Sequence, residues 1–94
     1  MREYELICIA HPELDENAFQ DLIKRVSSWI TDDGGEVFKT ELWGKRKLAY
    51  PIRKQTEGLY VLLRTKMAPG FGAQLDRNLR LLEPVLRYLL IAKE

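Results

Sequence analysis

The order in which hydrophobic periodicity changes along these 94 residues restricts the fold more than any other feature. Short strand-like runs lie before, between and after two stretches whose apolar residues recur at helical spacing. A chain this short has enough apolar residues for only one core, so the predicted strands must share a sheet and the predicted helices must cover it. We therefore expect a single domain that spans residues 1–94.

The first part of the chain predicts a strand followed by a helix. The apolar run at 4–10 is typical of a central strand and stops before Pro12. Asp15 is a suitable N-cap for the helix, and the Asp-Gly-Gly sequence at 33–35 is a suitable stop. The apolar residues at helical spacing between these points are Phe19, Leu22, Ile23, Val26 and Ile30.

The middle of the chain predicts two strands, over 36–52 and 59–67, joined into a hairpin by the polar segment 53–58. Gly44 is expected to mark a bulge in the first of them. Alternate side chains of the second strand belong to opposite faces of the sheet. Its core-like face holds Leu59, Val61, Leu63, Thr65 and Met67, and its other face holds Tyr60, Leu62, Arg64 and Lys66.

The last part of the chain predicts a second helix and a final strand over 85–92. Pro69 can occupy the first turn of this helix, and Glu83 followed by Pro84 ends it. Its inward residues are Leu75, Leu79 and Leu82. The complete order is strand, helix, strand, strand, helix, strand. It predicts the α+β class and a ferredoxin-like βαββαβ sandwich, in which two helices cover one face of a four-stranded antiparallel sheet.

Charge is distributed unevenly although the formal net charge is only +1. Residues 1–41 hold four basic and ten acidic side chains, whereas residues 42–66 hold seven basic and one acidic. A charged hairpin is most often a solvated surface that blocks edge pairing. Interleaved Trp43, Tyr50 and Tyr60 can instead stack on unpaired bases, so both interpretations stay open. The basic side chains of the hairpin are Lys45, Arg46, Lys47, Arg53 and Lys54.

Residues 44–52 read Gly-Lys-Arg-Lys-Leu-Ala-Tyr-Pro-Ile and follow an N-terminal Met-Arg-Glu-Tyr-Glu. With these motifs the chain resembles, over essentially its whole length, the ribosomal protein six family of the bacterial small subunit. The resemblance implies a non-catalytic structural protein that needs no cofactor. It also implies binding to the central domain of small-subunit ribosomal RNA together with ribosomal protein eighteen. Its implied rRNA contacts are Arg2, Tyr4, Lys45, Arg46, Lys47, Tyr50, Arg80 and Arg87.

The sheet face opposite the helices is expected to bind a protein partner, because an apolar area on so small a protein usually marks an interface. Arg87 should lie on this face because its neighbour Tyr88 points to the helices. We expect Leu62 and Leu89 to face water in the free protein. A homodimer would fit equally, and the alternative function is a protein-interaction module of this fold without RNA binding. The predicted partner contacts are Tyr60, Leu62, Leu89 and Ile91.

Catalytic and metal-binding functions have little support in the sequence. A single Cys8 and a single His11 provide no zinc ligand set, and His11 has no visible nucleophile to activate. Cys8 is expected to be a small buried apolar residue. Residues 10–13 lack the cation of an acylphosphatase-like phosphate loop, and 57–61 lack the aromatic pair of an RNA-recognition motif. The acidic N-terminus suits no targeting peptide, so we expect a cytoplasmic protein that does not bind a membrane. We also expect no small-molecule substrate.

Overall fold

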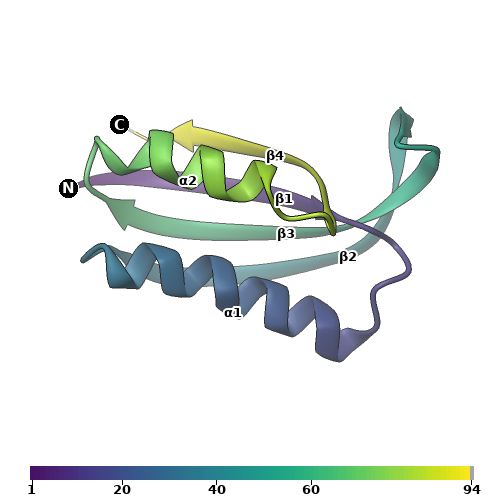
Figure 1. Cartoon of the computed structure of the whole chain (residues 1–94), viewed down its shortest axis with the longest axis horizontal. Coiled ribbons are helices and arrows are strands. Elements are labelled where there is room, and N and C mark those ends of the chain that lie inside the picture. Colours follow the sequence, from purple (N-terminus) through teal and green to yellow (C-terminus); the bar gives the residue numbers. More distant parts are fainter. Residues whose placement is uncertain (94) are drawn as a thin grey trace.

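The computed structural model describes residues 1–93, so Glu94, the last residue of the predicted domain, lies outside the described part. All neighbouring strands are antiparallel and form one sheet in the order β2-β3-β1-β4. This architecture confirms the predicted ferredoxin-like sandwich (Figure 1). The elements are β1 (Arg2–Ala10), α1 (Glu16–Asp32), β2 (Glu36–Ile52), β3 (Gln55–Met67), α2 (Phe71–Arg80) and β4 (Val85–Ala92).

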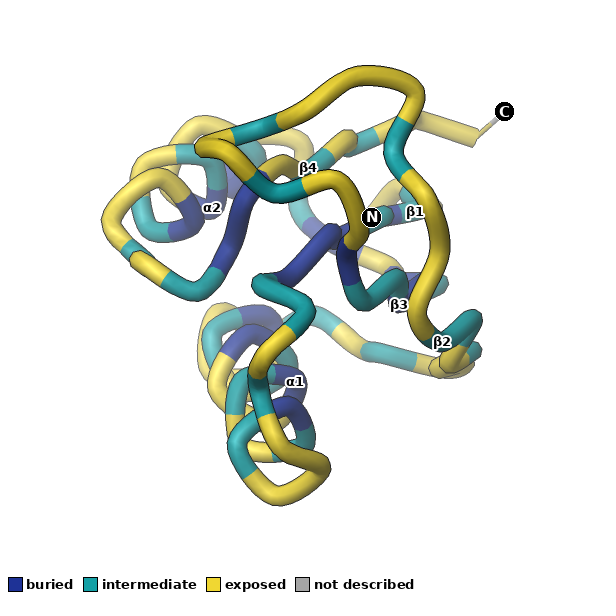
Figure 2. The backbone as a smooth tube through the Cα atoms, turned by 90° about the vertical axis from the view of Figure 1, so that its right-hand side faces the viewer, coloured by how far each residue is buried: buried dark blue, intermediate teal, exposed yellow. Residues whose placement is uncertain are grey.

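The core lies between the helices and one face of the sheet. Figure 2 shows both helices on the same side of the sheet, with their buried segments turned toward it. The predicted alternation in β3 is confirmed, because Val61, Leu63 and Met67 are each at most 2% exposed. Two leucines of α2, Leu75 and Leu79, are as deeply buried. Neither helix in residues 1–93 is long and apolar enough to cross a bilayer.

The first helix begins and ends where the sequence predicts. The Asp15 carboxylate accepts a hydrogen bond from the Ala18 backbone N–H at 2.7 Å, which satisfies one of the free donors of the first turn. At the other end, Gly34 has φ +85°, a conformation that glycine adopts without steric cost. The chain can therefore turn directly from α1 into the edge strand β2.

The boundaries predicted for the second helix are wrong at both ends. Pro69 precedes α2 instead of occupying its first turn, because Ala68 O accepts a hydrogen bond from Phe71 N in a turn before the helix. The helix ends at Arg80, so Leu82 lies in the following loop and packs against the core from there. At this end Leu81 N donates to Asn78 O and Leu82 N donates to Leu79 O, so the last turn tightens to three-residue spacing and the α-helix stops.

The hairpin of β2 and β3 extends beyond the rest of the sheet. Pairing between β1 and β3 stops at Ala10 with Leu59, so residues 46–58 have no third strand beside them (Figure 1). The predicted bulge at Gly44 is confirmed by a register shift and by φ +81°. The predicted polar connection at 53–58 is wrong, because a two-residue turn suffices and β3 starts at Gln55.

The burial of Leu62 corrects the expectation that this residue faces water in the free protein. Leu62 lies on the face opposite the helices, yet it is only 5% exposed. Its strand is an inner one, and Leu62 pairs with Ile7 on one side and Glu41 on the other. Side chains on both flanking strands therefore shield it. Alternation in the sequence assigns a residue to a face but does not report how well that face is covered.

Candidate functional site

We use the name open face for the side of the sheet that carries no helix. At one end of it, the β2–β3 hairpin bends across the sheet and encloses an apolar groove of about 270 Å³. The sheet contributes one wall and the hairpin the other. The residues that line the groove are Ile7, Ile9, Trp43, Leu48, Ala49, Tyr50, Ile52, Tyr60, Arg87 and Leu89.

Two aromatic rings and an arginine stack on the hairpin side of this groove. Trp43 and Tyr60 face each other across β2 and β3, with ring centroids 6.3 Å apart and planes inclined by 17°. The Arg46 guanidinium lies 5.3 Å from the centroid of the Trp43 ring, and its Nε donates to Trp43 O at 3.5 Å. The stack therefore presents a positive charge next to an apolar surface. Lys45 and Lys47, on either side of Arg46, are exposed.

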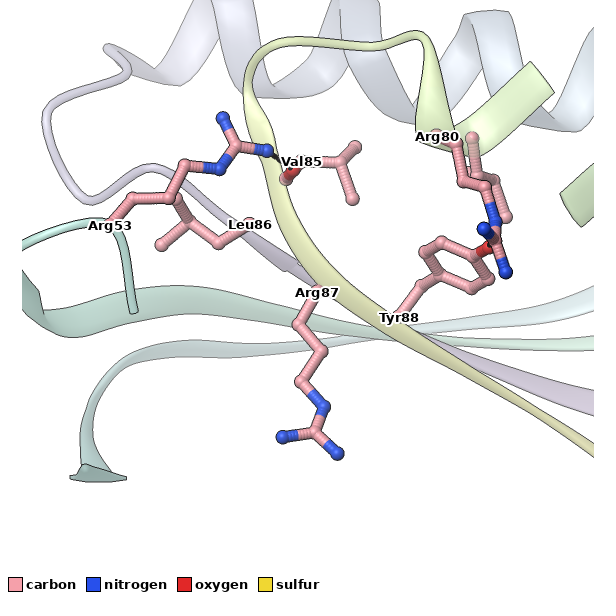
Figure 3. A pocket seen from close by; sticks show the side chains of 7 residues that line it. Arg53, Arg80, Val85, Leu86, Arg87 and Tyr88 are labelled. Atoms are coloured by element: carbon pink, nitrogen blue, oxygen red, sulfur yellow. Dashed lines mark hydrogen bonds between the residues drawn. The ribbon is translucent and has the colours of Figure 1, made fainter. Parts of the chain in front are cut away.

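Arg87 connects the final strand to the hairpin. Its guanidinium lies 5.9 Å from the centroid of the Tyr50 ring and donates a hydrogen bond to the Tyr50 hydroxyl. Figure 3 shows Arg87 pointing away from Arg53 and Arg80, toward the other side of β4. This confirms that Arg87 shares the open face with Leu89, and it brings together two residues that lie far apart in the sequence.

Arg53 makes structural hydrogen bonds that were not predicted from the sequence. From the hairpin turn, Nη2 donates to Val85 O at 2.6 Å, at the start of β4 (Figure 3). Nη1 donates to Glu83 O at 2.9 Å, two residues earlier in the chain. The sequence placed Arg53 only in a cluster of charges. Nothing in the sequence indicates that carbonyls thirty residues away would accept its hydrogen bonds.

Arg80 lies on the helix side of β4 and has partners of its own. Its Nε is 3.0 Å from an Asp76 carboxylate oxygen and 3.2 Å from the Tyr88 hydroxyl, which also donates to Asp76. The hydrogen bond with Tyr88 and the charge of Asp76 raise the pKa of Arg80 above its ordinary value. These contacts tie the end of α2 to β4, so Arg80 is not part of the groove.

Arg2 and Tyr4 lie toward the opposite end of the sheet from the hairpin. Arg2 pairs with Met67 at the last position of β3, whereas Lys45 pairs with Leu59 near the hairpin. Tyr4 is half-buried and packs against the core between sheet and helices. The structure therefore divides the predicted rRNA contacts into one group at the hairpin and another at the chain termini.

The open face near the termini carries paired charges beside the apolar Ile91, which pairs with Glu5 in the sheet. Arg64 Nε lies 3.3 Å from Glu5 Oε2 in an ion pair without hydrogen-bond geometry, and Lys93 Nζ lies 3.8 Å from Glu5 Oε1. One Glu5 carboxylate thus pairs with a cation from β3 and with a second cation just after β4.

The predicted partner contacts differ in how far they are exposed to solvent. Leu89 and Ile91 are 49% and 42% exposed, and Tyr60 is half-buried in the groove wall. Leu62 is covered, which removes it from any surface that a partner can reach in the folded protein. The sequence missed Ile52 and Leu48 as groove residues, because only the bend of the hairpin brings them over the sheet.

Cys8 and His11 have local structural roles. Cys8 is 4% exposed as predicted, and burial raises the pKa of its thiol to about 12. His11 Nδ1 accepts a hydrogen bond from the Glu13 backbone N–H at 3.2 Å, in the turn that leads to α1. A thiol held neutral in this way is a poor nucleophile.

Comparison with known proteins agrees with this architecture. The family model described as ribosomal protein S6 matches residues 3–92. The small ribosomal subunit protein bS6 of Caldanaerobacter subterraneus subsp. tengcongensis is 44% identical over 91 residues, which cover 97% of this chain and 96% of that protein. The bS6 of Mycobacterium bovis is 45% identical over 87 residues, with 93% and 91% covered.

The fold of this chain also agrees closely with that of a solved structure. The crystal structure of 30S ribosomal protein S6 from Thermotoga maritima superposes with a TM-score of 0.92 at 28% sequence identity, and the match covers 98% of this chain and 87% of that one. Its likeness extends through the strand order and both helices. The chain therefore belongs to the ribosomal protein S6 family, a family of small ribosomal subunit proteins and not of enzymes.

Proposed function

We propose that this ribosomal protein binds the central domain of small-subunit ribosomal RNA together with ribosomal protein eighteen. The observation that supports this most directly is the adjacency of two unlike surfaces. The exposed basic run at 45–47 lies on the same hairpin that encloses the apolar groove. A protein partner can bury the groove while RNA phosphates meet the lysines and arginine beside it.

The RNA contacts in this proposal centre on the hairpin. Lys45, Arg46 and Lys47 provide phosphate contacts, and Tyr50 and Arg87 form a stacked pair at the border of the groove. The other implied residues contribute less: Arg80 is committed to Asp76 and Tyr88, Tyr4 is half-buried, and Arg2 meets RNA only if the RNA also reaches the terminal end of the sheet.

Ribosomal protein eighteen occupies the groove and the adjoining apolar part of β4 in this proposal. Leu89 and Ile91 are exposed there, and the Tyr60 ring forms part of the groove wall. A few well-packed residues near the centre of an interface carry most of the binding energy, and tyrosine is common among them. The net charge of only +1 also makes a basic partner useful for holding RNA.

The RNA part is tested with the preformed protein pair and a central-domain rRNA fragment, by filter binding over a series of salt concentrations. The double variant Arg46→Glu with Lys47→Glu should bind more weakly, and the slope of log K against log salt should fall by about 0.9 for each phosphate that the variant no longer neutralises. The matched control is Lys24→Glu with Arg25→Glu, the same charge change on exposed residues of α1. Equally weakened binding in both double variants would remove the hairpin from the RNA interface.

The partner part is tested by calorimetric titration with ribosomal protein eighteen. Leu89→Asp should weaken the pairing by about 1–3 kcal/mol, as for a residue near the centre of an interface. Leu81→Asp is the matched control, because Leu81 is 77% exposed in the loop after α2, away from the groove. Pairing that is normal while the pair binds no RNA would favour the alternative, an interaction module without RNA binding.

A further inference from the structure

The end of the hairpin needs an anchor that its own hydrogen bonds do not supply. Residues 46–58 form a two-stranded extension, and such a hairpin is only marginally stable in water on its own. Its turn residues Arg53 and Lys54 both have positive φ, at 48° and 65°. Turns of this kind favour Asn-Gly or Gly-Gly, so two long side chains here indicate that surrounding contacts hold the turn in place.

Arg53 makes contacts that can hold the turn. Its two terminal nitrogens donate to Glu83 O at 2.9 Å and Val85 O at 2.6 Å, so both branches of the guanidinium are used at once. The hairpin belongs to the β2 side of the sheet and the two carbonyls belong to the β4 side. One side chain thus joins the two opposite edges at this end of the sheet. Only a guanidinium offers two donors in this fixed fork.

We propose that Arg53 is a positioning residue that holds the hairpin closed over the sheet and so preforms the groove and orients the basic run at 45–47. This role in binding rests on the function proposed above. The groove exists only while Leu48 and Ile52 of the hairpin lie opposite Ile7 and Leu89 of the sheet. When the hairpin is open part of the time, the apparent affinity for the partner is the affinity of the closed form multiplied by the closed fraction.

The test compares Arg53→Ala with Lys54→Ala in the full chain. Both variants remove one positive charge and both place alanine at a positive φ, so they match in charge and in backbone strain. Lys54 is exposed and makes no side-chain hydrogen bond or ion pair within residues 1–93. Arg53→Lys keeps the charge and loses the fork. Amide hydrogen exchange followed by NMR reports opening of residues 46–58 directly, and urea unfolding verifies that each variant is folded.

We expect the amides of 46–58 to exchange at least about fivefold faster in Arg53→Ala than in Lys54→Ala, with the amides of β1 unchanged, because only the local opening is affected. Arg53→Lys should fall between the two. Pairing with ribosomal protein eighteen should weaken in the same order. Equal exchange in the two alanine variants would overturn the proposal whatever the binding data show.

The binding arm separates two further outcomes. Faster exchange with unchanged partner affinity would show that the hairpin opens but that Arg53 does not position the interface, which also overturns the proposal. If the wild-type protein itself does not bind ribosomal protein eighteen, the proposed function fails, and the exchange comparison alone decides whether Arg53 holds the hairpin closed.

Discussion

The two faces of the sheet share the same four strands but differ in how they are covered. On the helix-covered face, Leu6 and Leu63 are at most 1% exposed. On the open face, Leu62 is 5% exposed and Leu89 is 49% exposed. The helices seal the inner strands of one face, although Leu42 on the edge strand β2 is 53% exposed there. The hairpin shields only one end of the other face. Strand alternation therefore decides the face of a residue, and the layer above it decides the burial.

The largest expected effect is on the helix-covered face. Leu63→Ala should lower the free energy of unfolding by about 2–5 kcal/mol, because it removes buried methyl groups and leaves a cavity that closely packed neighbours cannot fill. Urea denaturation measures this loss, provided that the denaturant dependence of the unfolding free energy is the same in both proteins. Leu42→Ala, on the same side of the neighbouring strand but 53% exposed, is the control and should cost far less. Similar losses would mean that the two residues are equally well packed.

Leu62→Ala tests whether the open face has a covered centre. We expect a loss of about 2 kcal/mol in the free energy of unfolding, near the lower limit for a buried leucine, because water can enter from the open side. The measurement is urea denaturation, read beside that of Leu63→Ala. A loss below about 0.5 kcal/mol would show that Leu62 meets water in solution, as its face alone would suggest.

The Cys8 thiol gives a pH-dependent test of the seal on the helix-covered face. Its pKa is raised from 9.0 to about 12 in the folded protein, so folding favours the neutral thiol. This stabilisation is fully present below pH 9 and is lost as the pH rises from 9 toward 12. Between pH 8 and pH 10, the wild type should lose about 1 kcal/mol more stability than Cys8→Ala. Parallel pH curves for the two proteins would show that the thiol is accessible to solvent.

The smallest effect is expected at the edge of the open face. Leu89→Ala should lower the free energy of unfolding by less than about 1 kcal/mol, because half of this side chain already meets water. Thermal or urea unfolding of the isolated protein measures it. A cost equal to that of Leu63→Ala would remove the difference between the two faces and would mean that the hairpin covers Leu89 more fully than the structure indicates.

Local patterns were sufficient to predict the fold. The N-cap at Asp15, the stop at Gly34 and the final strand Val85–Ala92 all follow from residue chemistry that acts over a few positions. The end of α2 was misplaced because Leu82 has the spacing of a helical core residue while it packs from a loop. Spacing alone does not distinguish these two ways of reaching the core.

The candidate site was predicted only in part, because its geometry depends on the bend of the hairpin. The sequence identified Arg87 and Leu89 on the open face and the basic run at 45–47. It could not show that Tyr50 lies against Arg87 or that Arg53 reaches the start of β4, since both contacts join segments about thirty residues or more apart. The two-residue turn was missed as well, because neither Arg53 nor Lys54 is a usual residue at positive φ.

The strand order has a consequence for the protein as it is made. β1 is the first strand to be synthesised, yet it lies between β3 and β4, and β4 is the last. An emerging chain therefore carries a central strand with one unpaired edge until β4 leaves the ribosome. Contacts this distant in sequence form late and slowly compared with local ones. This small subunit protein should complete its sheet only after β4 has emerged from the ribosome.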